Sequence, residues 1–138
     1  MSKSLKIDFV HRYLWYSKDT RGTKKPYTCL SLIGKSGAAY PIWATVDTGA
    51  DRVQLDARFG IKAGYDVFNN RNIVRLKVAN GRLAKFYKVP NVKIEVEGEE
   101  FEQDVLFGRG IPNLLGRRGI FASIDFGLDD EGWLFKYL

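Results

Sequence analysis

The residues of this chain that could do chemistry are concentrated at positions 44–51, which read ATVDTGAD. An apolar, β-branched run leads directly into Asp47, and Thr48 and Gly49 follow it. A carboxylate placed in this way emerges at the end of a strand, beside a hydroxyl side chain and a glycine that permits close backbone approach. The same residues taken alone also fit an ordinary turn after a strand, so the rest of the chain must decide between the two interpretations.

Other kinds of active site lack their minimum parts in this sequence. His11 is the single histidine and Cys29 is the single cysteine. Neither a zinc site nor a Ser-His-Asp arrangement can be assembled from such a set. The apolar neighbours of Cys29 are typical of a small core residue. We therefore expect no metal site and no cofactor.

The size and composition of the chain indicate one domain spanning residues 1–138, with 45% hydrophobic and 14% aromatic residues to form its core. No apolar run is long enough to span a bilayer, and the start lacks the apolar core of a signal peptide. We expect a cytoplasmic protein with no membrane partner. The formal net charge is +6, but Lys and Arg are spread along the chain among 16 acidic residues. Nucleic acid is therefore not expected as a partner.

Short apolar and β-branched segments alternate with Gly, Asn and Pro, which predicts an all-β fold with one or two short helices. The glycines of residues 34–37 and the Asn80-Gly81 pair suit tight turns, the second of type I′. Residues 114–121 could hold a short helical turn. Four hairpins are predicted, formed by residues 28–33 with 39–46, 74–78 with 83–89, 92–96 with 101–107, and 124–126 with 133–137.

Three motifs, in this order along the chain, resemble those of the retropepsins, the single-domain aspartic peptidases of retroviruses and their cellular relatives. An apolar hairpin enters ATVDTGAD at 44–51, a glycine-bearing hairpin contains VANGR at 78–82, and NLLGR follows at 113–117. The resemblance covers about residues 28–125. It implies a retropepsin-like closed β-barrel or sandwich subunit with a flap hairpin.

The resemblance implies a role for each residue of the first motif. Asp47 matches the catalytic aspartate, and Thr48 would lock two such loops together across a dimer. Gly49 would offer its carbonyl to a substrate strand, and Ala50 completes the family motif. Asp51 matches an acidic residue that pairs with an arginine in the family.

That arginine is matched by Arg117, so the pair with Asp51 would tie the loop to the later segment. Asn80 and Gly81 would form the flap tip, and Pro112 and Leu114 would help to line substrate pockets. The alternatives are that Asn80-Gly81 is only a turn and that residues 112–115 are only core.

The chain also departs from the family pattern at three places. Arg118 stands where an Asp or Asn is usual, residues 1–26 have no counterpart that we can place, and residues 133–138 extend beyond the NLLGR segment. Retroviral enzymes use both termini to build their dimer sheet, so these differences leave the mode of dimerisation open.

The presence of one Asp-Thr-Gly motif has a consequence for subunit number. Peptide hydrolysis without a covalent intermediate needs a base to activate water and an acid to protonate the carbonyl oxygen, and two carboxylates sharing one proton can do both. A second Asp47 must then come from another copy of the chain.

We therefore expect a homodimeric aspartic endopeptidase that acts on a peptide or protein substrate. The alternative is a catalytically silent peptide-binding module of the same fold. A basic nucleic-acid-binding β domain is a third hypothesis, which predicts affinity that falls steeply with salt.

Overall fold

The computed structural model describes the backbone of residues 11–14, 17–18, 24–25, 27–78, 80–96, 98–118, 124–128 and 132–137, and the side chains of 27–78, 80–96 and 98–118. These residues are mostly in strands, with one short helix, α1 (Ala57–Lys62), and one 3₁₀ turn, η1 (Asn70–Asn72). The all-β prediction with one or two short helices is confirmed. No helix among the described residues is long and apolar enough to cross a membrane.

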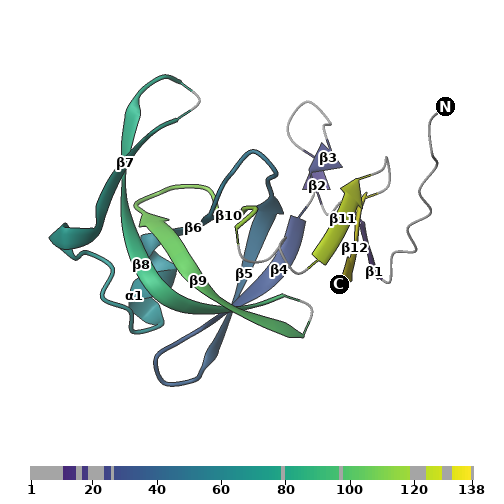
Figure 1. Ribbon diagram of the computed structural model, residues 1–138, viewed down its shortest axis with the longest axis horizontal. Coiled ribbons are helices and arrows are strands. Elements are labelled where there is room, and N and C mark those ends of the chain that lie inside the picture. The colour runs from purple at the N-terminus through teal and green to yellow at the C-terminus, as the bar shows by residue number, and fades with distance from the viewer. Residues whose placement is uncertain are drawn as a thin grey trace.

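The strands, in chain order, are β1 (His11–Leu14), β2 (Ser17–Lys18), β3 (Lys24–Lys25), β4 (Tyr27–Ile33), β5 (Ala39–Val46), β6 (Val53–Asp56), β7 (Ile73–Lys77), β8 (Leu83–Val96), β9 (Glu99–Gly108), β10 (Leu114–Leu115), β11 (Ile124–Leu128) and β12 (Gly132–Tyr137). Seven of them form one sheet in the order β4-β5-β10-β6-β9-β8-β7 (Figure 1). β1, β12 and β11 form a second sheet, and β2 pairs with β3.

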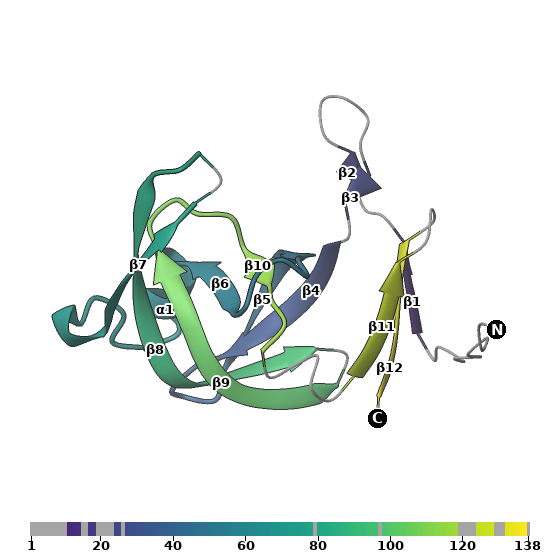
Figure 2. The same cartoon turned by 45° about the horizontal axis from the view of Figure 1, so that its top comes forward.

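The large sheet turns back on itself because β4 also pairs with β8, from Ser31 opposite Glu95 to Ile33 opposite Lys93. The length of β8 and a register shift between Val89 and Val92 make this possible, since a bulge bends a strand. Figure 2 shows the resulting curvature of β8 and β9. In both views the β7–β8 end of the molecule lies opposite the sheet of β1, β12 and β11.

The core of the described residues lies between the strands of this curved sheet. β4 alternates buried and half-buried positions, and Leu30 and Leu32 are fully buried. Ile42 from β5, Ile94 from β8 and Phe107 from β9 belong to the same apolar cluster. Successive side chains of a strand point to opposite faces, so every second side chain of these strands points into the core. Burial of these side chains therefore fixes the register of the strands from which the candidate site emerges.

The predicted hairpins are all present, with one difference in turn type. β4 pairs with β5, β7 with β8, β8 with β9, and β11 with β12. At the β7–β8 turn, Gly81 N donates to Val78 O and Val78 N donates to Arg82 O, both at 2.9 Å. These bonds close a three-residue loop instead of the predicted two-residue type I′ turn. Gly81, with φ of 80°, supplies the left-handed residue that such a loop needs.

The short helix is not where the sequence predicted one. Leu114 and Leu115 form β10, because they pair in parallel with Thr45 and Val46 of β5 and Leu114 also pairs with Gln54 of β6. Residues 119–121 of the predicted helical turn lie outside the described residues. The α-helix instead spans Ala57–Lys62 and was not predicted.

Candidate active site

Asp47 follows β5 directly and begins a tight loop, residues 47–52, which we call the site loop. Its backbone N–H donates to the carbonyl of Leu115 in β10 at 3.0 Å. Its carboxylate Oδ1 accepts from Gly49 N at 2.9 Å, and its carbonyl accepts from Ala50 N at 3.2 Å. The half-buried carboxylate is thus oriented by the loop backbone.

Gly49 has a steric role beside this carboxylate. A Cβ on Gly49 would lie 3.2 Å from the Asp47 carboxylate oxygen, closer than ordinary contact. Thr48, between them, is exposed. The hydrogen bond from Gly49 N orients the carboxylate, and a side chain at position 49 would crowd it.

Residues 112–118, which we call the anchor segment, hold the site loop from the side of β10. Arg117 N donates to Ala50 O at 2.9 Å, and Arg118 N donates to Asp51 O at 2.7 Å. The guanidinium of Arg117 also contacts the Asp51 carboxylate, as the resemblance implied. These two side chains are 56% and 66% exposed. An ion pair so exposed adds at most about 1 kcal/mol, so the backbone bonds are the main fastening.

Gly116 makes the closest approach between the anchor segment and the site loop. A Cβ built on it would lie 2.2 Å from the carbonyl oxygen of Arg52 and 2.5 Å from the carbonyl carbon. The neighbour is backbone, so no side-chain rotation could relieve the clash. Gly116 was part of a quoted motif, but the sequence did not indicate this contact.

Asn113 is a further residue that the sequence analysis missed. Its Oδ1 accepts from Asp56 N at 2.9 Å, its Nδ2 donates to Trp43 O at 3.3 Å, and its backbone carbonyl accepts from Thr45 N at 2.9 Å. It therefore ties β5 to the end of β6, on either side of β10. An Asn just before a short apolar strand is the only sequence signal, and it is a weak one.

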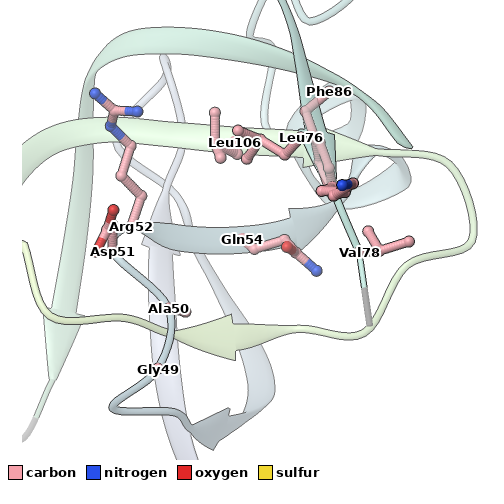
Figure 3. A pocket seen from close by; sticks show the side chains of 10 residues that line it. Gly49, Ala50, Asp51, Arg52, Gln54, Leu76, Val78, Phe86 and Leu106 are labelled. Carbon is pink, nitrogen blue, oxygen red and sulfur yellow. The ribbon is translucent and has the colours of Figure 1, made fainter. Parts of the chain in front are cut away.

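A pocket of about 340 Å³ lies between the site loop and the β7–β8 hairpin (Figure 3). On the loop side it is lined by residues 49–52, followed by Gln54 of β6. On the other side, Leu76, Val78 and Phe86 belong to the hairpin, and Leu106 comes from β9. The pocket thus has a polar wall from the site loop and a mainly apolar wall from the hairpin, to which Lys77 also contributes.

The remaining predicted site residues lie outside this pocket. Asp47 and Thr48 adjoin it in sequence but do not line it. Asn80 and Gly81 are exposed at the hairpin tip. Pro112 is exposed and its carbonyl accepts from Gln54 Nε2 at 3.0 Å, and Leu114 is half-buried in β10. Within the described part of one chain, the structure therefore gathers residues 49–51 at the pocket and leaves the four predicted substrate contacts apart from it.

Among the described residues, no group of three or more His, Cys, Asp or Glu side chains could hold a metal ion. The site loop carries two carboxylates, Asp47 and Asp51, and the Asp51 carboxylate forms an ion pair with Arg117.

No protein-family model and no curated protein matches this chain. Its function is therefore inferred from the residues and their geometry.

Proposed function

We propose that the chain is a retropepsin-like subunit of a homodimeric aspartic endopeptidase. One observation carries the proposal: two segments far apart in the sequence, the anchor segment and the β7–β8 hairpin, meet around the site loop. The anchor segment bonds to the loop at residues 47, 50 and 51, and the β7–β8 hairpin faces it across the pocket. In this proposal the curved seven-stranded sheet is the barrel of the subunit, and the β7–β8 hairpin is its flap.

The site of one chain supplies one carboxylate suited to catalysis. Asp47 is half-buried and oriented by Gly49, whereas Asp51 is bound to Arg117. A twofold axis beside the exposed Thr48 would bring a second Asp47 next to the first. Two carboxylates about 3 Å apart cannot both ionise, so the pair would share one proton.

The shared proton lets the pair act as base and acid in the same step. The ionised carboxylate takes a proton from a water molecule, and the water oxygen bonds to the peptide carbonyl carbon. The protonated carboxyl gives its proton to the carbonyl oxygen, which yields a tetrahedral diol. Collapse of the diol breaks the C–N bond, and the leaving nitrogen takes a proton from the pair. The products are a carboxylic acid and an amine, and no covalent enzyme intermediate forms.

The pocket supports an extended peptide as the proposed substrate. A peptide in extended form could run along the exposed backbone of the site loop, under the hairpin, and hydrogen-bond as an added strand. Leu76, Val78 and Phe86 offer an apolar wall to one of its side chains. Leu76 and Val78 are 40% and 37% exposed in the single chain, so they are available for such a contact. We therefore expect a preference for apolar side chains near the cleaved bond.

The test is cleavage of a mixed peptide library by the wild type and by Asp47→Asn, from mildly acid to neutral pH. The proposal expects cleavage by the wild type, with a rate that falls on both sides of an optimum, and none by Asp47→Asn. Asp66→Asn is a matched control, since it removes an exposed carboxylate that belongs neither to the site loop nor to the pocket lining, and it should leave cleavage intact. Peptide binding by a dimeric wild type without cleavage would replace the endopeptidase with the silent binding module.

A further inference from the structure

The β7–β8 hairpin carries a concentration of positive charge that the composition of the whole chain conceals. Between Asp66 and Glu95 the sequence contains seven of the 22 Lys and Arg residues and none of the 16 acidic residues. Arg75 and Lys77 lie on β7 and Lys85 lies on β8, and all three are exposed. The fold thus brings together on the β7–β8 hairpin basic residues that the sequence analysis treated as spread along the chain.

The hairpin has two chemically different faces. Val74 and Leu76 of β7 lie opposite Phe86 and Ala84 of β8, and Leu76 and Phe86 line the pocket. Successive side chains of a strand point to opposite faces. This face of the ribbon is therefore apolar and directed toward the site loop.

The other face, which we call the basic face, carries the three cations Arg75, Lys77 and Lys85, together with the exposed Leu83 opposite Lys77. Arg75 lies directly opposite Lys85 in the strand register. Lys77 also borders the pocket, but the alternation along β7 places its side chain on the same face as Arg75. One strand repeat of two residues, about 6.6 Å, separates Arg75 from Lys77.

Nothing in the described part of the chain neutralises the basic face. No carboxylate there lies within 4 Å of Arg75, Lys77 or Lys85. The Lys85 ammonium lies 5.3 Å from the centroid of the Tyr87 ring, which holds it on this face but leaves its charge in place. Like charges directly opposite each other destabilise a strand pair.

Protection of an edge strand does not account for the arrangement. Lys and Arg on an edge strand discourage pairing with other chains, and β7 is the edge of the seven-stranded sheet. That explanation covers Arg75 and Lys77. It does not cover Lys85, which lies on the inner strand β8 and adds repulsion to Arg75.

We propose that the basic face binds the sugar-phosphate backbone of duplex nucleic acid. Every repeat unit of that backbone carries one negative charge, so it can meet closely spaced cations on both strands of the ribbon at once. An acidic protein segment offers no such regular row. A two-stranded β-ribbon also fits the major groove of a duplex.

The basic face favours a duplex over a single strand. Single-strand binding relies on exposed aromatic rings that stack on bases. The one ring on this face, Tyr87, is 9% exposed, so it has no free surface for stacking. Binding should therefore be independent of base sequence and sensitive to salt.

The test is fluorescence anisotropy of a labelled 24-base-pair duplex with the full chain, between 50 and 200 mM salt. Three phosphate contacts predict a slope of about −2.7 in log affinity against log salt, which is a loss of about 40-fold over this range. The triple variant Arg75→Gln, Lys77→Gln, Lys85→Gln should lose this slope and bind at least about 10-fold more weakly at 50 mM salt.

A control of equal charge separates the basic face from the net charge of the protein. Lys35→Gln, Lys62→Gln and Lys93→Gln together remove three exposed cations from other surfaces, and this variant should bind the duplex like the wild type. Equal weakening by both triple variants would overturn the proposal, provided that circular dichroism shows both to be folded. Displacement of the duplex by polyglutamate at equal charge concentration would instead assign the face to an acidic protein. Tighter binding of the corresponding single strand would also overturn the proposal.

The proposal does not depend on catalysis. Asp47→Asn removes a carboxylate of the site loop, which faces the apolar side of the hairpin and not the basic face. This variant should therefore bind the duplex as tightly as the wild type does. Loss of peptide cleavage with retained duplex binding would show that the two proposals stand or fall separately.

Discussion

Replacing Gly116 by alanine would test the position of the site loop directly. The added Cβ would lie 2.2 Å from the Arg52 carbonyl oxygen, whereas ordinary contact begins near 3.4 Å. The two backbone segments would have to separate by about 1.2 Å. The anchor segment is fixed because it contains β10, which pairs with β5 and β6. The site loop is fixed because it continues directly into β6. The clash therefore cannot be relieved without disturbing one of them.

The magnitude follows from this geometry. Overpacking a close contact costs about 1–3 kcal/mol, and a backbone neighbour places Gly116→Ala at the upper end, about 3 kcal/mol. Urea denaturation should show a lower midpoint with an unchanged slope. A displacement of about 1 Å at an active site can cost about 100-fold in rate. We therefore expect the folded variant to cleave peptide about 100-fold more slowly than the wild type.

Gly37→Ala is the matched control for this experiment. Gly37 has φ of 88° but no atom within 4 Å of an added Cβ. The substitution should cost about 1–2 kcal/mol through backbone conformation alone and leave the rate of cleavage unchanged. If Gly116→Ala were as stable as the wild type within about 0.5 kcal/mol, the close approach to Arg52 would be wrong.

Three further predictions concern the surroundings of the site. Asn113→Ala removes the acceptor of the Asp56 N–H and the Nδ2 donor to the Trp43 carbonyl, and should lower the unfolding free energy by about 1–3 kcal/mol in urea denaturation. Burial raises the pKa of Asp56, but hydrogen bonds from Arg58 and Gly110 and the charge of Arg58 outweigh it, so the pKa is lowered. The stability it provides is present above the unfolded pKa and is lost as pH falls through the lower folded value. The stability difference between wild type and Asp56→Asn should therefore be constant above about pH 5 and shrink below about pH 4; a constant difference down to pH 2 would refute this. If each active site needs two copies of Asp47, specific activity should fall on dilution below the dimer dissociation constant, and a concentration-independent value would exclude a dissociable dimer.

The hairpins were predictable from the sequence because their signals are local. β4 alternates buried and half-buried positions, β5 alternates buried positions with more exposed ones, and Gly37 permits the conformation of the connecting turn. β11 and β12 likewise flank a polar, glycine-bearing turn. A local pattern of this kind needs no knowledge of the rest of the fold.

The elements that complete the site were not predictable, because their structure depends on distant neighbours. Leu114 and Leu115 form a strand only because β5 and β6 lie on either side of them. Helix α1 contains Gly60, a poor helix former, and a Cβ there would lie 2.7 Å from Phe107 and Val67. Packing therefore requires a glycine at position 60, although glycine is unfavourable inside a helix.

The same dependence on distant contacts determines when the candidate site can form. The site loop receives its fixed bonds from the anchor segment, and the Asp51–Arg117 contact spans 66 residues. The β4–β5 hairpin can form from local contacts, but Asp47 N and Ala50 O find their partners only in residues 115 and 117. Contacts of such long range stabilise the chain only after the loop entropy between them has been overcome. The Asp47 carboxylate is therefore oriented within its own motif by Gly49 N, but the loop that carries it is held in place by the completed sheet.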